Sequence, residues 1–262
     1  MNVFKELYSY RELLKTSVKK EIRGKYKASF LGVLWSFLNP LLQILVYVIV
    51  FPHLMRGATG DNYVIYVCTG VIPWVFFSTV VSMSVGSVRA NGNLIKKVYF
   101  PRVILPISTA FSSLFTFMIS CVIILAFCLF YGIGISWVIV FVPLIALLQT
   151  LFALGIGMAL SAMDVYAADL EYIVTFLLNL LFYGSPVVYQ LSMFGSDSLL
   201  VKLIRLNPIT KFLECYRNCF LYQVPPSFST MLTLLAIALI SVIVGYTVFR
   251  RLEKGFAEEL LY

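Results

Sequence analysis

Charged residues are scarce in this chain of 262 amino acids. Asp, Glu, Lys and Arg together make up 12% of the sequence, whereas hydrophobic residues make up 61%. A typical soluble domain carries charges at about a quarter of its positions, so the composition excludes that class and indicates an integral membrane protein. The apolar stretches are continuous, whereas a membrane β-barrel would show short alternating strands, so helices are favoured.

Residues that could catalyse a reaction or bind a metal are also few. The chain has one histidine, His53, which cannot form a zinc site with the usual partners. It has neither a G-x-x-x-x-G-K-[ST] phosphate-binding loop nor a G-x-S-x-G nucleophile motif. We therefore predict that the chain is not an enzyme and holds no catalytic residue, metal or cofactor of its own. The five cysteines are expected to be small packing residues, at Cys68, Cys121, Cys128, Cys215 and Cys219.

Long uncharged runs are what the sequence does contain. A membrane-spanning helix needs about 20 apolar residues, and five runs reach or exceed that length, the longest being divided by two glycines in Tyr131–Trp137. We therefore predict an all-α integral membrane protein with six transmembrane helices. The predicted spans lie near residues 30–52, 63–88, 103–131, 137–162, 172–190 and 227–249. No charged residue lies inside them, which argues against an ion-coupled transporter.

Small residues recur every four positions in the fourth predicted span, at Ala153, Gly157 and Ser161. Such a stripe lets two helices approach closely. We expect it to serve packing within one subunit more than a contact between two copies.

Basic residues are unequally divided between the two sides that six spans would create. Fifteen Lys and Arg fall on the side of the termini and five on the other side. The positive-inside rule therefore predicts that both termini are cytoplasmic. No cleavable signal peptide is expected at the N-terminus, because the basic arm is followed directly by a run of full span length.

The N-terminal arm, residues 1–28, has an amphipathic pattern. At about 100° per residue, its apolar side chains fall on one narrow helical face and its bases lie around the other side. The apolar positions are Phe4, Leu7, Leu14, Val18 and Ile22, and the basic ones include Lys19, Lys20, Arg23 and Lys27. We predict a helix on the inner membrane surface, near anionic lipid. Whether it also contacts a cytoplasmic partner stays open at this point.

The loop "NGNLIKKVYFPRV", residues 91–103, separates the second and third predicted spans. Asn91 or Asn93 can cap a helix, and Pro101 can set the start of the next span. We predict a short helix beneath the membrane that presents Leu94, Ile95, Lys96 and Lys97. A loop that only joined two spans would need neither a cap nor apolar side chains, so docking to a partner is favoured.

Two short amphipathic segments lie between the fifth and sixth predicted spans. They are "SLLVKLIR" (198–205) and "FLECYRNCFLYQ" (212–223), on either side of "NPIT" (207–210), where Asn-Pro favours a turn. Each is too short to span a membrane. We predict two re-entrant helices in the outer leaflet, beside a water-filled outer mouth.

Asp164, Asp169 and Glu171 form an acidic cluster after the fourth predicted span. The two aspartates are about 140° apart on a helix, so they do not form a facing pair. We expect a solvated cluster at a helix end.

Five blocks of the sequence resemble the membrane subunits of ABC-2 type exporters, in the branch that exports lipid-linked polysaccharides such as O antigen, teichoic acid and capsule-like polymers. The blocks are "RGKYKASFLGVLWSFLNPLLQ" (23–43), "GVIPWVFFS" (70–78), "NLIKKVYFPRVILP" (93–106), "LLFYGSPVVY" (180–189) and "NPITKFLECYR" (207–217). The resemblance covers nearly the whole chain. It implies a single transmembrane domain, 1–262, with an interface helix (1–28), spans one to five (29–190), an outer re-entrant segment (191–226), and span six with a cytoplasmic tail (227–262).

The same resemblance implies partners and a location. The loop between spans two and three would be a coupling helix that docks on a separate ATPase subunit, present in two copies, which binds the ATP and Mg. Two copies of the chain would form the conduit in the bacterial cytoplasmic membrane, and no nucleic acid is involved. The implied coupling residues are Asn93, Leu94, Ile95, Lys96, Lys97 and Val98, and those of the interface helix are Arg23, Tyr26 and Lys27.

A lipid-linked polysaccharide sets further expectations. Its pyrophosphate needs cations, for which the candidates are Arg23, Lys25, Lys27 and Arg89. Its sugar rings need flat apolar contacts, for which the candidates are Trp35, Phe37, Trp74, Phe76, Phe77, Phe182 and Tyr183. Each aromatic could instead belong to a belt at the lipid interface. The candidates for an outer gate are Pro186, Asn207 and Pro208.

Two other functions remain open on the sequence. One is an ABC-2 permease for a lipid or a drug. The other is a membrane enzyme of lipid-linked sugar chemistry, for which Asp164, Asp169 and Glu171 are the only acidic candidates. A scaffold would not need the outer re-entrant helices.

Overall fold

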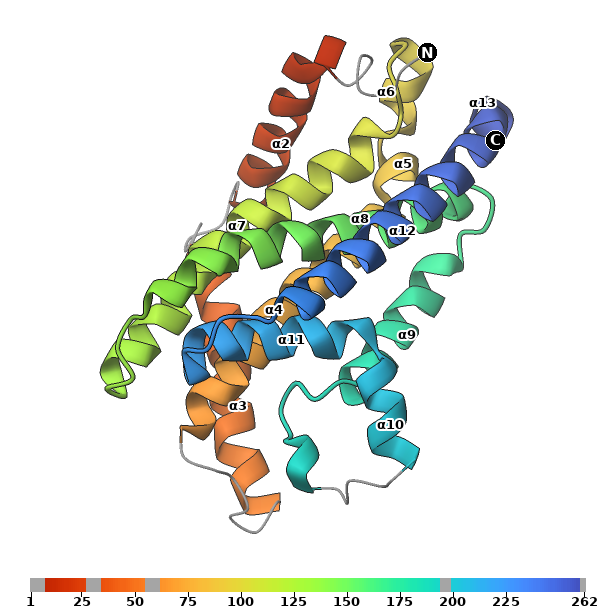
Figure 1. Cartoon of the computed structure of the whole chain (residues 1–262). Helices are drawn as coiled ribbons and strands as arrows, with labels where there is room; N and C mark the ends of the chain where they lie inside the picture. Colours follow the sequence, from red (N-terminus) through yellow and green to blue (C-terminus); the bar gives the residue numbers. More distant parts are fainter. Residues whose placement is uncertain (1–7, 27–33, 55–61, 194–198, 260–262) are drawn as a thin grey trace.

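The computed structural model describes residues 8–26, 34–54, 62–193 and 199–259, and this part of the chain is helical without strands (Figure 1). The longer helices are α2 (Arg11–Tyr26), α3 (Trp35–Leu54), α4 (Tyr63–Val85), α7 (Ile104–Phe130), α8 (Val142–Asp164), α9 (Leu170–Tyr183), α11 (Pro208–Arg217) and α12 (Phe228–Leu252). The shorter ones are α5 (Ser87–Ala90), α6 (Gly92–Lys97), α10 (Leu199–Leu206) and α13 (Phe256–Glu259). The all-helical fold is confirmed.

Within the described residues, four helices are long and apolar enough to cross a membrane. They are Tyr63–Val85, Ile104–Phe130, Trp137–Asp164 and Phe228–Gly255. Two shorter apolar helices, Phe37–His53 and Leu170–Tyr183, occupy the places of the first and fifth predicted spans. Residues 30–33 of the first predicted span lie outside the described residues. Six spans therefore stay a prediction, while the membrane character of the chain is confirmed.

The prediction for the fifth span, 172–190, is wrong at its C-terminal end. Helix α9 ends at Tyr183, and the chain then turns through Gly184 and Pro186. Glycine loses more backbone conformational entropy in a helix than other residues do, and proline has no backbone N–H to donate a hydrogen bond that would continue the helix. The hydrophobic run continues past this point, which is why composition alone overestimated the length of the helix.

Helix α4 is the centre of the fold. Residues on all sides of it are buried, as expected for a helix that is hydrophobic all round. It contacts α3, α7, α8, α9 and α11. Pro73 interrupts its internal hydrogen bonding, and the side-chain amide of Gln149 on α8 donates to the Pro73 carbonyl at 3.1 Å. A neighbouring helix thus donates a hydrogen bond to the carbonyl of the proline itself.

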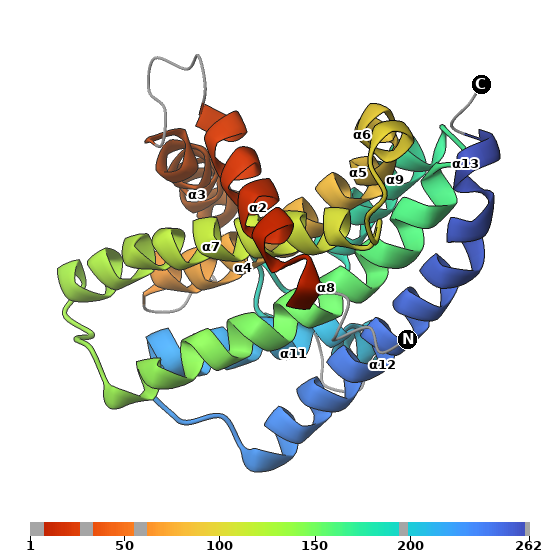
Figure 2. The same ribbon diagram turned by 90° about the horizontal axis from the view of Figure 1, so that it is seen from above.

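Helix α8 lies between α7 and α12, as Figure 2 shows. The small residue Gly157 lets α8 approach α4, because a Cβ there would come within 2.7 Å of Ser84. The stripe predicted in this helix therefore serves packing inside the subunit, at least at Gly157. The closest approach of α8 to α12 uses a different pair, Gly155 and Gly245, whose backbones touch.

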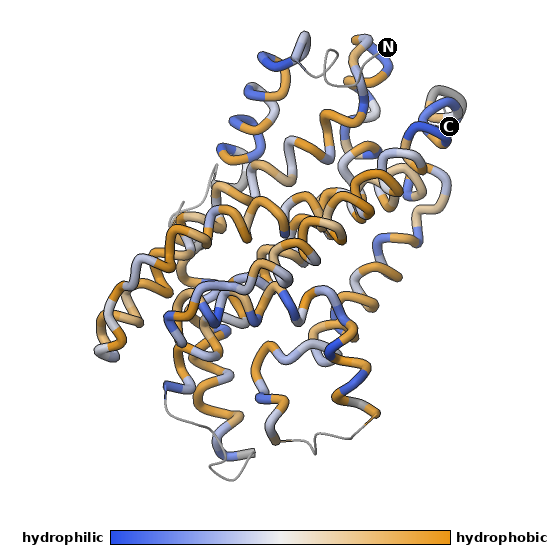
Figure 3. The backbone as a smooth tube through the Cα atoms, in the orientation of Figure 1, coloured by the Kyte–Doolittle hydropathy of each residue, from blue (hydrophilic) through white to orange (hydrophobic). Residues whose placement is uncertain are grey.

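The polar ends of the molecule are well separated. Figure 3 shows hydrophilic residues gathered on α2, on α6 and at the end of α12, with hydrophobic residues between these and the opposite end. Figure 1 places α2, α6 and α13 at one end and α10 at the other. Which end faces the cytoplasm stays a prediction. All five cysteines are buried and free, which confirms their packing role.

Candidate functional site

A groove of about 610 Å³ lies between α3, α4 and α9, and none of the described residues that line it is charged. Its wall includes the aromatic residues Tyr47, Trp74, Phe182 and Tyr183. The rings of Tyr47 and Phe182 stack with centroids 5.7 Å apart, and Trp74 meets Phe182 edge-on at 5.6 Å. The groove therefore presents a connected aromatic surface built from three helices.

Polar but uncharged side chains complete this groove. They are Asn39, Gln43, Ser78, Ser82, Thr175 and Asn179. The hydroxyls of Ser78 and Thr175 donate to carbonyls of their own helices. The side-chain amides of Asn39, Gln43 and Asn179 have no hydrogen-bond partner within the part of the chain that the structure describes. Each amide offers donors and an acceptor to a ligand.

The groove continues onto an exposed face of α9. Tyr172, Phe176, Asn179 and Tyr183 fall within about 60° of one another around the helix. The three aromatic residues are 78%, 67% and 69% exposed. We call these four residues the α9 stripe. Large aromatic side chains rarely stay this exposed on a protein surface without a lipid or a partner to cover them.

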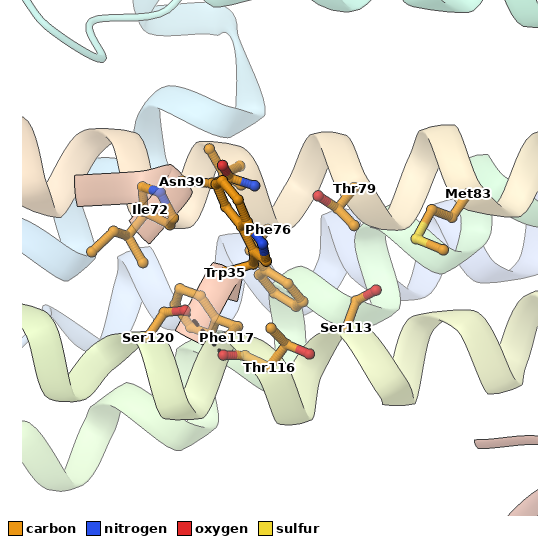
Figure 4. Close-up of a pocket in the computed structure, with 12 residues that line it drawn as sticks. Trp35, Asn39, Ile72, Phe76, Thr79, Met83, Ser113, Thr116, Phe117 and Ser120 are labelled. Atoms are coloured by element: carbon orange, nitrogen blue, oxygen red, sulfur yellow. Dashed lines mark hydrogen bonds between the residues drawn. The ribbon is translucent and has the colours of Figure 1, made fainter. Parts of the chain in front are cut away.

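A second cavity, of about 320 Å³, lies next to the groove, between α3, α4 and α7. Asn39, Pro40 and Val75 line both spaces. Figure 4 shows Trp35 beside Phe76, with the hydroxyls of neighbouring residues pointing into the space between α4 and α7. Those hydroxyl residues are Thr79, Ser113 and Thr116. The described residues that line this cavity also include aromatic side chains and carry no charge.

The predicted short helix is present between α4 and α7, as α5 and α6. Asn91 stands at the N-terminus of α6, but its side chain does not cap that helix; it donates instead to the Ser87 carbonyl at 2.9 Å. The predicted cap at Asn91 or Asn93 is therefore wrong. Leu94 and Ile95 are half-buried against the core, whereas Lys96 and Lys97 are exposed. Val98 and Tyr99, at the tip, are 52% and 91% exposed.

Arg89 ties this tip region to the end of α8. Its guanidinium donates to the backbone carbonyl of Asp164 and lies 3.5 Å from the Asp164 carboxylate. Asp164 is completely buried. The prediction of a solvated acidic cluster is therefore wrong for Asp164, because α5 covers it, while Asp169 and Glu171 are exposed as expected. Among the described residues, no group of three potential ligands could hold a metal.

Within the described part of the N-terminal arm, Arg11–Tyr26 is helical as predicted and packs on α7. Leu14, Val18 and Ile22 line an apolar groove together with residues of α7 such as Phe115. Phe4, Leu7 and Lys27 lie outside the described residues. The exposed carboxylate of Glu12 accepts a hydrogen bond from Lys15 at 2.9 Å, which lowers the pKa of that carboxyl.

One acid of α2, Glu21, points at α7. Its carboxylate accepts hydrogen bonds from Ser108 at 2.8 Å, Thr109 at 3.1 Å and Ser112 at 2.8 Å. Hydrogen bonds to a charged acceptor are stronger than neutral ones. This contact holds the arm to the third predicted span.

The candidate gate residues at the other end of the molecule also come together. Asn207 accepts a hydrogen bond from the backbone N–H of Ile209, which caps α11, and its amide donates to Ser185 at 2.8 Å and to the Gly184 carbonyl at 3.2 Å. Pro208 starts α11. The turn after α9 is thereby fixed to the beginning of α11.

Arg217, at the end of α11, is 3% exposed. It donates to the carbonyls of Pro186 and Val187 at 2.6 and 3.0 Å, and its guanidinium lies 3.6 Å from the centre of the Tyr66 ring. A Cβ on Gly70 would collide with both Val187 and Arg217. Helix α11 is thus packed against the turn after α9 and against α4. The predicted re-entrant position of this segment in the outer leaflet stays a prediction.

The chain matches a family model described as "ABC-2 type transporter" over residues 12–221. The chain belongs to the ABC-2 type transporter family. It is 33% identical over 260 residues to the O-antigen export system permease protein RfbA of Myxococcus xanthus, covering 99% of this chain and 100% of that protein. It is 32% identical to the RfbA of Klebsiella pneumoniae, with 95% of each chain covered. The polysialic acid transport protein KpsM of Escherichia coli is 24% identical, covering 90% of this chain and 92% of KpsM.

In this ABC-2 transporter, the predicted site residues separate into groups. Trp74, Phe182 and Tyr183 line one groove, whereas Trp35 lines the neighbouring cavity. Phe76 is buried and lines that neighbouring cavity beside Trp35. Phe37, half-buried against the core, and Phe77, which is buried, line neither of these two spaces. Sequence reasoning missed Tyr47 and the three amides. The amides carry no signal of their own, but the spacing of Tyr172, Phe176, Asn179 and Tyr183 could have revealed the α9 stripe.

Of the four cations predicted to contact pyrophosphate, Arg23 and Arg89 have side chains within the described part of the chain. Arg23 borders the groove between α2 and α7. Arg89 is engaged with Asp164, as described above. The side chains of Lys25 and Tyr26 lie outside the described residues, as does Lys27. Their proposed contacts with pyrophosphate or an ATPase stay predictions.

Proposed function

We propose that this chain is the permease subunit of an ATP-driven exporter that moves a lipid-linked polysaccharide, such as O antigen or a similar glycan, from the cytoplasmic side outward. A separate ATPase subunit in two copies would supply the energy, and a second copy of this chain would complete the conduit. Relatives named as O-antigen export permeases along their whole length support the substrate class.

The observation that carries the proposal is the neutral groove with its α9 stripe. A sugar polymer presents flat apolar ring faces and many hydroxyl groups. Aromatic rings cover the former, and unpartnered amides such as Asn39, Gln43 and Asn179 can bond the latter. The absence of charge in the lining lets a neutral polymer move without strong binding at any one point.

The stripe also supports a shared conduit. Its aromatic side chains lie on the side of α9 that faces away from the chain's own core. A second copy placed against this face would enclose the groove. The exposed tip of α5 and α6, with Lys96 and Lys97, supports docking of the ATPase at the opposite end from α10 (Figure 1).

The proposal is tested by deleting the gene in its host and locating the lipid-linked polymer. An exporter predicts that polymer accumulates on the cytoplasmic face of the membrane. If no polymer is made, the chain belongs to synthesis, as the enzyme alternative requires. If polymer still reaches the surface, the proposed function is wrong.

Complementation tests the groove itself. Phe176→Leu combined with Tyr183→Leu removes two rings, each worth about 1 kcal/mol of contact energy, so we expect export to fall roughly tenfold or more. The matched control is Phe130→Leu with Phe228→Leu, which removes two rings that are 83% and 84% exposed but lie outside the stripe and the groove. Equal export by both double variants, at equal protein levels, would contradict the role of the groove.

A further inference from the structure

A polar cleft of about 760 Å³ lies where α12 ends, at the same end of the molecule as α6 (Figure 1). The loop Tyr99–Arg102 forms one wall and the end of α12 forms the other. The lining is rich in tyrosine and in basic residues, among them Tyr10, Tyr99, Arg102, Arg250, Arg251 and Lys254. None of these residues lines the groove between α3, α4 and α9, and none is among the predicted coupling residues 93–98.

The charge of this cleft is unbalanced. Four cations face one carboxylate, that of Glu253. Arg250 pairs with the Glu253 carboxylate at 3.1 Å, and Arg102 donates to the Glu253 backbone carbonyl at 2.7 Å. The structure gives neither Arg251 nor Lys254 an acidic partner within the described residues. These two cations are therefore available to an anion.

The architecture of the cleft keeps its cations in place. Arg102 lies 5.6 Å from the centre of the Phe256 ring, and Phe256 is fully buried. The Tyr166 hydroxyl donates to the Leu252 carbonyl at 2.7 Å. The end of α12 is thus folded onto the loop after α8, so that the cleft has fixed walls rather than a free basic tail.

The cleft opens onto an apolar face of α12. Ile240, Val244, Thr247 and Arg251 follow one another at helical spacing and fall within about 60° around the helix. Ile240 and Val244 are 61% and 55% exposed, and Ile243 beside them is 64% exposed. A hydrocarbon chain lying on this face would lead directly to the guanidinium of Arg251.

We propose that this cleft binds the phosphate headgroup of an anionic membrane phospholipid, whose acyl chain lies along Ile240 and Val244. The phosphate would contact Arg251 and Lys254, with the hydroxyl of Tyr99 as a further donor. Aromatic and basic side chains at the end of a spanning helix are typical of residues that contact the lipid headgroups of a membrane. The continuity with the lipid-exposed face favours a lipid over a docked protein.

The test uses the purified full-length protein and native mass spectrometry of retained lipid, with phosphatidylglycerol as the probe against a phosphatidylcholine background. The double variant R251Q/K254Q should bind phosphatidylglycerol about 30-fold more weakly, because each cation near a membrane surface contributes about a fivefold preference for anionic lipid. The charge-preserving variant R251K/K254R should retain most of the binding. The control K202Q/R205Q removes two cations of α10, at the opposite end, and should bind like the wild type.

Unchanged phosphatidylglycerol binding by R251Q/K254Q would overturn the proposal. Equal losses in K202Q/R205Q would also overturn it, because the effect would then be one of net charge. Farnesyl diphosphate is added as a competitor: if it displaces phosphatidylglycerol at much lower concentration, the site is one for a prenyl diphosphate and the assignment to phospholipid is wrong. None of these outcomes depends on whether the chain exports a polysaccharide.

Discussion

At the scale of single residues, a few polar side chains join segments that are distant in the sequence. Glu21 links the arm to α7, and Arg217 links α11 to the turn after α9 and to α4. Tyr216 donates to Gln149 at 2.8 Å, and Gln149 donates in turn to the Pro73 carbonyl. A hydrogen bond between apolar helices has a fixed direction, so each of these contacts sets how two helices are placed.

Glu21 offers a direct test of the arm. Glu21→Ala removes the shared acceptor of three hydroxyls, and we expect the free energy of unfolding to fall by about 1.5–3 kcal/mol. The loss is no larger because those hydroxyls can still donate to backbone carbonyls of their own helix. Hydrogen exchange of α2 and thermal unfolding of the purified protein measure the effect. The control is Glu12→Ala, at an exposed acid of the same helix. Equal protection of α2 in both variants would contradict the role of Glu21.

Gly70 tests the close approach of three segments. Gly70→Ala puts a methyl group against the Val187 carbonyl and the Arg217 guanidinium, and the neighbouring atom of Val187 is backbone that cannot move aside. Overpacking of this kind costs about 1–3 kcal/mol or more. Gly24→Ala is the matched control, because no atom lies within 4 Å of its new methyl group. We expect a lower melting temperature for Gly70→Ala only.

At the scale of elements, α5 and α6 are the part of the chain most suited to contact a partner. Their tip exposes Lys96, Lys97, Val98 and Tyr99, while Arg89 fixes their base on Asp164. A rigid base with an exposed tip can pass a displacement from a docked protein to α8.

Charge reversal tests this docking. Lys96→Glu with Lys97→Glu should reduce co-purification of the ATPase subunit and its stimulated hydrolysis, since like charges would replace complementary ones at the contact. Lys202→Glu with Arg205→Glu makes the same change of charge on α10 and should leave both measurements unchanged. If the first variant behaves like the second, α6 is not the docking helix.

The helices could be predicted from hydrophobic runs and from the residues that break helices or form turns. Asn-Pro predicted a turn, whereas the structure also starts α11 there, four residues before the predicted amphipathic segment 212–223, because Asn207 caps the helix locally. What the sequence could not reveal depends on distant partners. From the sequence, Arg217 had no role beyond its place in the amphipathic segment 212–223, yet it lies against Tyr66 and donates to two carbonyls. The groove was predicted only in part, because its lining comes from three helices that are separate in the sequence.

At the scale of the whole molecule, polarity and topology can be tested together. Helices α6 and α10 lie at opposite ends (Figure 1); Tyr99 follows α6 by two residues and Lys202 belongs to α10. The native cysteines are all buried and should react slowly. With cytoplasmic termini, Tyr99→Cys should react with a membrane-impermeant maleimide only in inside-out vesicles, and Lys202→Cys only in right-side-out ones. Labelling of both from the same side would contradict the predicted topology.

The shortness of α9 has a consequence for the surrounding bilayer. Its 14 residues rise only about 21 Å, whereas the hydrocarbon layer is about 30 Å thick. In the predicted six-span topology the remaining distance is bridged by non-helical backbone, in which the carbonyls of Val188 and Tyr189 accept hydrogen bonds from the hydroxyls of Tyr63 and Tyr66. A single copy would therefore make the bilayer thinner beside α9. This hydrophobic mismatch favours binding of a neighbouring protein that shields α9 from the lipid.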